Sequence, residues 1–467
     1  MRISFCFVLV PMKRLLAVFL VACGSTTNEV PDAGQDAGTP AITFFDVSSG
    51  TPVATTKMLW ANALDIRVTG LPPLTQADVT ARFTGWGATA TFTSDASGTI
   101  DLATSYAASG SYQGIDADGI VWSMTKGASP DDPQNDPFGL RVHVDIAGVT
   151  VASAELARLA MTEDVTCSNV SDDGLVGYFC SKTGASPRGA IVVFGGSEGG
   201  IGTGQSMARY YASLGYPSLG LAYFGQAGVP ATLAHVPLEY FGTAFAWVAK
   251  QPSVAPGKLV VMGGSRGGEL ALILGANFPQ QVTAVVAQLP SGLVWPGIDS
   301  TFTPVGAWTL SGNELPYVAA WGDGTTVHEP DGINAFSETP AFHASIAASS
   351  QSELDAATTH VENTNGPILM IAGAADDLWP ACDLSKYAMD RLTSSGHATK
   401  YGDALLCYPD AGHNIDAFTV GVPTTTAMHT STPVNGAFLA LGGTPEGIAH
   451  ATRDADDKVR VFLAKNL

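Results

Sequence analysis

The stretch KLVVMGGSRGGELALILG, Lys258–Gly275, passes from an apolar run through a glycine-rich turn into a longer run that mixes apolar and polar residues. The first run has the length and composition of a buried parallel strand, and the second has those of a helix. Gly263 and Gly267 flank Ser265 in the turn, and glycine relieves the crowding of so sharp a turn. The stretch therefore predicts a strand, a tight turn and a helix, with Ser265 exposed at the helix N-terminus as a candidate nucleophile.

The same rhythm continues on both sides of this stretch. Apolar strands such as AIVVFGG, YPSLGLAYFG and VTAVVAQLP alternate with helical segments such as SMARYYASLG and LEYFGTAFAWVAKQ. Continuous apolar strands separated by helices are typical of a mostly parallel sheet with helices on both faces. We therefore expect residues 189–467 to form an α/β domain whose functional residues lie at the carboxyl ends of its strands.

A serine hydroxyl is a weak nucleophile until a neighbouring imidazole takes its proton and a carboxylate orients that imidazole. PILMIAGAADDLWP predicts a strand followed by Asp376 and Asp377; Asp376 has the better register for the acid, and Asp377 is the alternative. ALLCYPDAGHNI predicts a further strand, followed by His413 on a loop. The chain order of Ser265, Asp376 and His413 is that of the α/β-hydrolase fold, which makes these residues the predicted catalytic triad.

The negative charge that develops on the oxygen of an acyl substrate needs two backbone N–H donors. We expect the first from Arg266, directly after Ser265, and the second from Gly196 or Ser197 in the loop GGSEGG. This loop lacks the Gly-Lys-Ser/Thr ending and the Rossmann spacing of nucleotide-binding loops. Because neither a metal-ligand spacing nor a cofactor motif occurs near these residues, we predict a site without metal or cofactor.

The pattern is different before the α/β domain. Residues 41–162 contain short alternating segments separated by turn residues, which predicts a smaller all-β sandwich domain that supports or covers the α/β domain. Residues 163–188 include TCSNVSDDGLVGYFC and are expected to form a connecting hairpin. The segments expected as strands of the sandwich are ITFFDV, ALDIRVTGL, VTARFTG, ATFTSD, IVWSM and LRVHVDI.

The chain begins with the features of an export signal. Lys13 and Arg14 precede a short apolar run, and the sequence LVACG that follows resembles the lipobox of bacterial lipoproteins. We expect residues 1–22 to be a lipoprotein signal peptide and Cys23 to be acylated; an ordinary cleaved signal or a buried helix is the alternative. Residues 23–40 are predicted to be a disordered acidic tether. These features predict a bacterial cell-envelope protein, exported and lipid-anchored as a periplasmic or outer-membrane lipoprotein.

The cysteine and charge contents agree with export and exclude one class of partner. Beyond the N-terminal segment an even number of cysteines favours two disulfides, Cys167 with Cys180 and Cys382 with Cys407. Small buried thiols are the alternative. The formal net charge of −20 argues against a nucleic-acid partner, because such binding depends on Lys and Arg releasing counterions.

The chain also contains, in this order, GSYQGIDADGIVWSM, GLAYFG, LEYF, GGSRGGELAL, AADDLW, CYPDAGH and GGTPEGIAHA. With these motifs it resembles the acyl-CoA thioesterase and bile acid-CoA:amino acid N-acyltransferase family, from about Ala41 to the C-terminus. The resemblance implies an α/β-hydrolase domain preceded by a β-sandwich. It also implies a triad of Ser265, Asp376 and His413 that cleaves a thioester through an acyl-enzyme.

The resemblance further implies a small-molecule acyl thioester as the substrate. The acyltransferase branch of the family has Cys at the nucleophile position, so Ser265 favours hydrolysis with water as the acyl acceptor. Coenzyme A is an intracellular polyanion, whereas this chain is acidic and expected to be exported, so an extracellular ester is an open alternative. Acyl transfer to an amine or alcohol, and a surface binding protein without catalysis, are the further alternatives. The sequence leaves the oligomeric state open.

Overall fold

A computed structural model describes residues 38–133, 139–299, 304–319, 322–329, 332–415, 422–423, 425–429 and 438–467. The expected signal peptide, Cys23 and almost all of the expected tether lie outside these residues. Within the described part, no helix combines the length and the apolar character that a membrane span requires.

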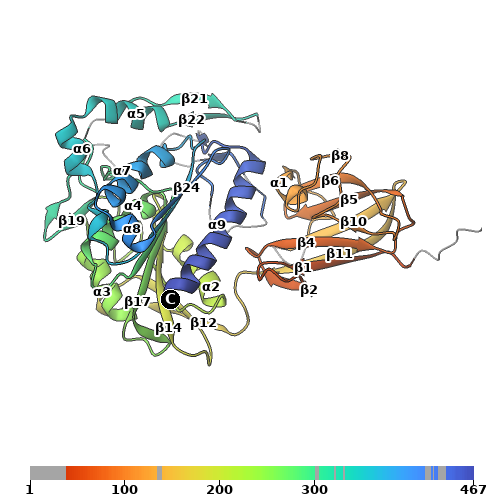
Figure 1. The fold of residues 1–467 in the computed structure, drawn as a ribbon, viewed down its shortest axis with the longest axis horizontal. Helices are drawn as coiled ribbons and strands as arrows, with labels where there is room; N and C mark the ends of the chain where they lie inside the picture. Colours follow the sequence, from red (N-terminus) through yellow and green to blue (C-terminus); the bar gives the residue numbers. More distant parts are fainter. Residues whose placement is uncertain are drawn as a thin grey trace, which may run out of the picture.

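Two sheets face each other in the N-terminal part of the chain, at the right of Figure 1. Their strands are β1 (Ala41–Asp46), β2 (Val53–Thr55), β3 (Lys57–Leu59), β4 (Leu64–Thr69), β5 (Gln76–Phe83), β6 (Trp86–Thr93), β7 (Ile100–Asp101), β8 (Ser109–Gly110), β9 (Thr125–Lys126), β10 (Leu140–Ile146) and β11 (Val149–Leu159). One sheet has the order β2-β1-β4-β7; the other has the order β3-β11-β10-β5-β6-β8, with β9 paired to β6. Alternate residues such as Val142 and Val144 are fully buried between the sheets, as a sandwich requires.

The prediction of one strand in the sandwich is wrong. The segment IVWSM overlaps a short helix, α1 (Gly119–Trp122). The carboxylate of Asp116 accepts hydrogen bonds from the amide of Asp118, at 2.9 Å, and from Nε1 of Trp122, at 2.8 Å. Such bonds from an Asp side chain compete with strand pairing and favour a turn. Ile120 and Val121 are buried in the sandwich core, so their apolar character alone does not distinguish a strand from a helix.

The second part of the chain is built on a sheet in the order β12-β13-β15-β14-β17-β18-β23-β24. These strands are β12 (Val165–Val170), β13 (Gly177–Lys182), β14 (Arg188–Phe194), β15 (Ser218–Leu221), β17 (Val254–Gly264), β18 (Ala284–Gln288), β23 (Ile368–Gly373) and β24 (Ala404–Tyr408). Neighbours from β15 to β24 are parallel, and the hairpin β12–β13 adds an antiparallel edge beside β15. The strand order reverses between β14 and β17, which is where α/β sheets bind their ligands.

Helices cover both faces of this sheet. The helices α2 (Gly202–Ser213) and α9 (Pro445–Asn466) contribute buried residues to one core, and α3 (Glu239–Val248) and α4 (Arg266–Asn277) to the other. Figure 1 shows α3 and α9 on opposite sides of the sheet. The architecture is the α/β-hydrolase fold that the sequence predicted.

Further elements follow β15, β18, β23 and β24. They include two small sheets, β16-β19-β20 and β21-β22-β26-β25, and in Figure 1 the strands β21 and β22 lie with α5 above the main sheet. The amides of Glu338 and Thr339, at the start of α5, donate to the carbonyl oxygen of Asp377, so this insertion reaches the carboxyl end of β23. The bounds are β16 (Val236–Pro237), β19 (Trp308–Leu310), β20 (Asn313–Glu314), β21 (Thr325–His328), β22 (Asn334–Ser337), β25 (Ala427–His429), β26 (Phe438–Ala440), α5 (Thr339–Ala348), α6 (Gln351–Ala357), α7 (Ala381–Ser394) and α8 (His397–Tyr401), with 3-10 turns at Asp172–Gly174 and Val361–Asn363.

Candidate active site

Ser265 lies between the end of β17 and the start of α4, in a backbone conformation with φ 58° and ψ −123°. A non-glycine residue with positive φ is uncommon and is found at functional turns. A Cβ atom at position 263 would lie 2.5 Å from the ring of Phe194, and one at position 267 would lie 2.3 Å from the carbonyl oxygen of Gly195. Both flanking positions therefore require glycine, as the sequence predicted for a strained turn that presents Ser265.

His413 and Asp376 form a hydrogen-bonded pair. The Nδ1 atom of His413 lies 2.8 Å from Oδ2 of Asp376, whose side chain is completely buried. The other carboxylate oxygen accepts hydrogen bonds from the amides of Leu378 and Trp379, at 3.0 and 3.1 Å. Burial raises the pKa of Asp376, and the neighbouring His413 opposes that rise. The carboxylate is thus held in one orientation by backbone donors while it faces the imidazole.

The alternative acid, Asp377, has different partners. Its Oδ1 atom accepts a hydrogen bond from the hydroxyl of Ser337 at 3.1 Å, and its carbonyl oxygen accepts one from the same hydroxyl at 2.9 Å. The structure therefore brings Asp376 to His413 and uses Asp377 to anchor the end of β22.

The pair shares one edge of the sheet with Ser265. The amide of Ser265 donates to the carbonyl oxygen of Gln288, at the end of β18. The next carbonyl oxygen, of Leu289, accepts from Nε1 of Trp379 at 3.0 Å, and the ring of Trp379 stands edge-on to that of His413. The ends of four neighbouring strands, β17, β18, β23 and β24, are linked in this way. Three of them, β17, β23 and β24, carry the predicted triad residues at their carboxyl ends.

The predicted oxyanion loop lies directly against the Ser265 turn. A Cβ atom at Gly196 would be 3.1 Å from the Cβ of Ser265 and 2.9 Å from the carbonyl oxygen of Gly264. The amide of Gly196 already donates to Oε2 of Glu198 at 2.9 Å. Of the two donors expected from this loop, Gly196 is therefore engaged within the loop, and the amide of Ser197 is the better candidate beside that of Arg266.

A buried tyrosine, which no motif in the sequence marked as part of the site, fixes the direction of this loop. The hydroxyl of Tyr223 lies 2.9 Å from the carbonyl oxygen of Gly195 and 3.1 Å from that of Gly196. In a trans peptide the C=O and the following N–H point in opposite directions. Because the carbonyl of Gly196 faces Tyr223, the amide of Ser197 is aimed away from Tyr223. Burial raises the pKa of Tyr223, so its hydroxyl keeps its proton and remains a donor.

The side chain of Arg266 is buried and occupied beneath the turn. Its Nη2 atom donates to the carbonyl oxygen of Trp295 at 3.0 Å and lies 3.4 Å from Oε1 of Glu269. Glu269 in turn accepts a hydrogen bond from Nε1 of Trp308 at 2.7 Å, and burial raises its pKa to about 7. This pair braces the first turn of α4 and leaves the backbone amide of Arg266 as its contribution to the site.

A further carboxylate near His413 was not predicted. Glu338 ends the segment that leads from β22 into α5; burial raises its pKa, and the nearby His413 opposes that rise. No local motif marks Glu338, because it reaches the site from an insertion after β18.

The structure pairs the four cysteines as the sequence predicted. Cys167 and Cys180 face each other in the register of β12 and β13 and form a disulfide. Cys382 and Cys407 form the second disulfide, which joins α7 to β24. The second bridge links the helix that follows Asp376 to the strand that precedes His413.

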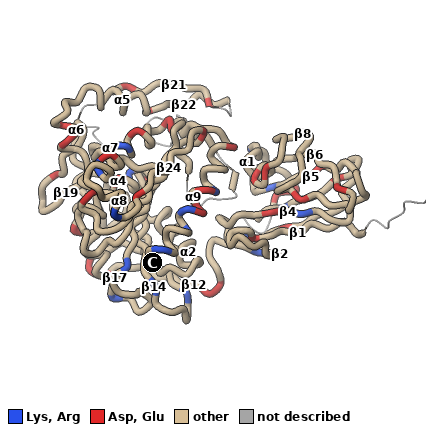
Figure 2. The backbone as a smooth tube through the Cα atoms, viewed as in Figure 1, with Lys and Arg blue, Asp and Glu red and all other residues tan. Residues whose placement is uncertain are grey.

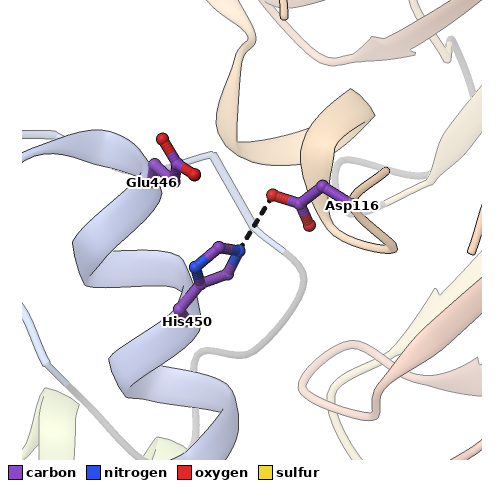
Figure 3. A group of neighbouring side chains, drawn as sticks. All are labelled: Asp116, Glu446 and His450. Atoms are coloured by element: carbon purple, nitrogen blue, oxygen red, sulfur yellow. Dashed lines mark hydrogen bonds and ion pairs between the residues drawn. The ribbon is translucent and has the colours of Figure 1, made fainter. Parts of the chain in front are cut away.

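Asp116, Glu446 and His450 gather where the sandwich meets α9 (Figure 3). Their potential ligand atoms lie within 4.8 Å of one another. No metal-ligand motif in the sequence indicated this grouping. The Nε2 atom of His450 is 2.8 Å from Oδ2 of Asp116, which also accepts from Trp122, and this hydrogen bond raises the pKa of His450. The hydrogen bond accounts for Asp116 and His450 as a contact between domains, while Glu446 acts on His450 through its charge. We assign no metal to the cluster.

Comparisons with known proteins agree with the motifs and the geometry. The family model described as the acyl-CoA thioester hydrolase/BAAT N-terminal region matches residues 61–172, and the model described as the BAAT/acyl-CoA thioester hydrolase C terminal matches residues 236–467. Acyl-coenzyme A thioesterase 6 of Mus musculus is 26% identical over 87% of this chain and 94% of that protein. Mitochondrial acyl-coenzyme A thioesterase 2 of Rattus norvegicus is 26% identical over 87% of each chain.

Among solved structures, the dienelactone hydrolase-like promiscuous phosphotriesterase P91 from metagenomic libraries is 17% identical, with a TM-score of 0.36, over 64% of this chain and 99% of that one. A putative dienelactone hydrolase from Klebsiella pneumoniae is 16% identical, with a TM-score of 0.33, over 53% of this chain and 86% of that one. The two family models together span most of the sandwich and the part of the α/β domain that carries Ser265, Asp376 and His413. The chain therefore belongs to the acyl-CoA thioester hydrolase/BAAT family.

Proposed function

We propose that the chain is a serine hydrolase that cleaves an acyl thioester through a covalent acyl-enzyme on Ser265. The observation that carries the proposal is the strained turn at Ser265, which shares one sheet edge with the hydrogen-bonded pair of His413 and Asp376. Membership of a family whose relatives are named as acyl-coenzyme A thioesterases supports a thioester as the substrate.

In the proposed first step, the hydroxyl oxygen of Ser265 attacks the thioester carbonyl and His413 takes the hydroxyl proton. Asp376 holds the imidazole through Nδ1 and stabilises its charged form. The amides of Arg266 and Ser197 donate to the oxygen that becomes negative. When the C–S bond breaks, His413 passes the proton to the sulfur, and a free thiol leaves while the acyl group stays on Ser265.

In the second step, water attacks the acyl-enzyme with His413 as the base. The bond between the acyl carbon and Ser265 breaks, the proton returns to the serine oxygen, and a carboxylic acid leaves. Acyl transfer would need an amine or alcohol in place of water at this step. The serine at position 265 supports hydrolysis, because the acyltransferase branch that the sequence resembles has cysteine there.

We also propose that the protein works outside the cytosol, anchored through a lipid on Cys23. Two disulfides support this location, because disulfides persist in oxidising compartments and are rare where thiols are kept reduced.

Labelling with a fluorophosphonate probe tests whether Ser265 is an activated nucleophile. We expect one probe per chain on the wild-type protein, located at Ser265 by peptide mass spectrometry, and none on Ser265→Ala. A folded wild-type protein that stays unlabelled would overturn the enzymatic proposal in favour of a binding protein.

A further inference from the structure

The carboxyl edge of the main sheet is poor in basic residues. Between Arg266 and Lys386 the sequence contains neither Lys nor Arg, and the same is true between Lys400 and Arg453. These two intervals contain the segments that follow β18, β23 and β24. The segments that follow β14 and β15 also lack basic residues up to the helices they lead into, α2 and α3. Apart from Arg266, whose side chain is buried, the loops that surround Ser265 therefore offer neither Lys nor Arg to a substrate.

Three of the four basic residues that bound these intervals have acidic partners, and the fourth, Lys400, lies over the ring of Tyr401. Arg266 is buried against Glu269, as described above. Lys386 pairs with Asp383 at 2.7 Å in the second turn of α7, and Arg453 on α9 is bonded to Asp118 of the sandwich.

Basic residues of the sandwich are also engaged. Arg67, Arg82 and Arg141 each form an ion pair with a carboxylate inside their own domain. Lys126 lies over the ring of Trp86. These contacts hold the four basic side chains within the sandwich.

Acidic residues, by contrast, are present at the edge. Asp377 and Asp410 line a hollow of about 320 Å³ together with Asp376, Thr339 and Thr444. Glu338 lies close enough to influence His413, and Glu198 lies in the oxyanion loop. The strands β21 and β22 and the helix α5 contain neither acidic residues nor Lys or Arg, but Asp323, Glu329 and Glu338 lie in the segments between and beside them. Along this part of the tube Figure 2 shows red positions and no blue ones.

A thiol that carries a nucleotide is a poor match for such an edge. Coenzyme A has three phosphate groups, roughly four negative charges at neutral pH. Proteins bind such groups with Arg, Lys or exposed helix N-termini, and carboxylates within about 8 Å, the screening length at physiological salt, repel them. We infer that the substrate of this site has a leaving group without phosphate, so that an uncharged acyl thioester is preferred to an acyl-CoA. This inference rests on the proposed function of Ser265.

The test compares two substrates with the same acyl chain, acyl-CoA and the matching acyl-pantetheine. The two thiols share the pantetheine arm next to sulfur and differ in the phosphates and nucleotide. With the full-length protein we expect kcat/KM for acyl-pantetheine to exceed that for acyl-CoA by about tenfold or more at low salt. Added salt should raise kcat/KM for acyl-CoA by screening repulsion and leave that for acyl-pantetheine within about twofold.

A charge variant sharpens the comparison. Asp410→Asn removes one charge at the edge with little change of shape, and Asp410 lies outside the proposed triad and oxyanion hole. We expect this change to raise the ratio of kcat/KM for acyl-CoA to kcat/KM for acyl-pantetheine at low salt by about two- to threefold. Asp173→Asn, in the hairpin between β12 and β13, is the matched control and should change neither value.

The outcomes separate the two proposals. Ser265-dependent turnover that favours acyl-CoA, or is insensitive to salt and to Asp410→Asn, overturns the inference and leaves the proposed hydrolase in place. Absence of Ser265-dependent turnover with either thioester overturns the proposed function and, with it, the inference.

Discussion

His413 and Asp376 meet through a single hydrogen bond of 2.8 Å between Nδ1 and Oδ2, although 37 positions separate them in the chain. The segment Leu441–Thr444 lies beside both loops. The amide of His413 donates to the carbonyl oxygen of Leu441, and Gly442 and Gly443 form bridges to Asp376 and Ala411. The loop before α9 thus contacts the loops of both the proposed base and the proposed acid and fixes their relative positions.

The first prediction separates the two candidate acids. Asp376→Asn should lower kcat by about 10³- to 10⁴-fold, because an amide cannot stabilise the imidazolium of His413 and favours the wrong tautomer. Asp377→Asn should change kcat by less than about tenfold, since Asp377 bonds to Ser337 instead. Steady-state kinetics on both variants measures the difference. A larger loss from Asp377→Asn than from Asp376→Asn would reverse the assignment.

The second prediction concerns Tyr223. Tyr223→Phe removes the hydroxyl that faces the carbonyl oxygens of Gly195 and Gly196, so the amide of Ser197 is less firmly aimed. We expect kcat to fall by about tenfold, the equivalent of roughly one net hydrogen bond, with KM nearly unchanged.

Tyr240→Phe is the matched control for this loss. The hydroxyl of Tyr240 donates to the carbonyl oxygen of Ala222 and accepts from the amide of Val176, neither of which belongs to the oxyanion loop. Thermal unfolding of both variants should show similar destabilisation. Equal losses of kcat in the two would mean that Tyr223 acts only through stability.

The third prediction is a pH dependence of stability. Burial raises the folded-state pKa of Glu269 from 4.5 to about 7, so between these values the folded chain binds more protons at this site than the unfolded chain. The contribution of Glu269 to the free energy of unfolding therefore falls as the pH rises through this window. Asp456, whose pKa is raised to about 6, contributes with the same sign over a narrower range.

Glu269→Gln tests this assignment. Urea unfolding at several pH values should show a smaller decline of stability between about pH 5 and pH 7 in Glu269→Gln than in the wild type. Glu163→Gln, at an exposed glutamate paired with Lys57, is the control and should keep the wild-type decline. An unchanged decline in Glu269→Gln would show that Glu269 does not titrate in this range.

The fourth prediction concerns the anchor. In a bacterial host that processes lipoproteins, Cys23→Ala should move the protein from the membrane fraction to the soluble fraction, because the acyl chains hold it to the membrane. Fractionation with an antibody against the chain measures this. Membrane association that persists in Cys23→Ala would contradict the proposed lipid anchor.

The features that depend on a local pattern of consecutive residues could be predicted from the sequence. The strand, the turn at Ser265 and α4 follow one another directly, and their apolar pattern and glycines have few other structural meanings. The order of Asp376 and His413 after parallel strands was predictable for the same reason, since those strand ends meet at one edge. The prediction of a strand for the segment IVWSM was wrong, because the carboxylate of Asp116 accepts hydrogen bonds that favour a helix there.

The remaining features depend on contacts between distant residues. Tyr223 meets Gly196 across 27 positions, and His450 meets Asp116 across 334. Glu338 approaches His413 from an insertion whose path no local pattern specifies. Such contacts can be predicted only when the order of the strands in the sheet and the docking of the two domains are known.

Direct observation of the acyl-enzyme tests the central claim. The full-length protein would be mixed with an acyl-pantetheine, quenched in acid during turnover, and examined by intact-mass and peptide mass spectrometry. We predict an added mass equal to one acyl group, located on Ser265 and absent from Ser265→Ala. Hydrolysis of the thioester by the wild type without any acyl group on Ser265, or with undiminished rate in Ser265→Ala, would contradict the proposed mechanism.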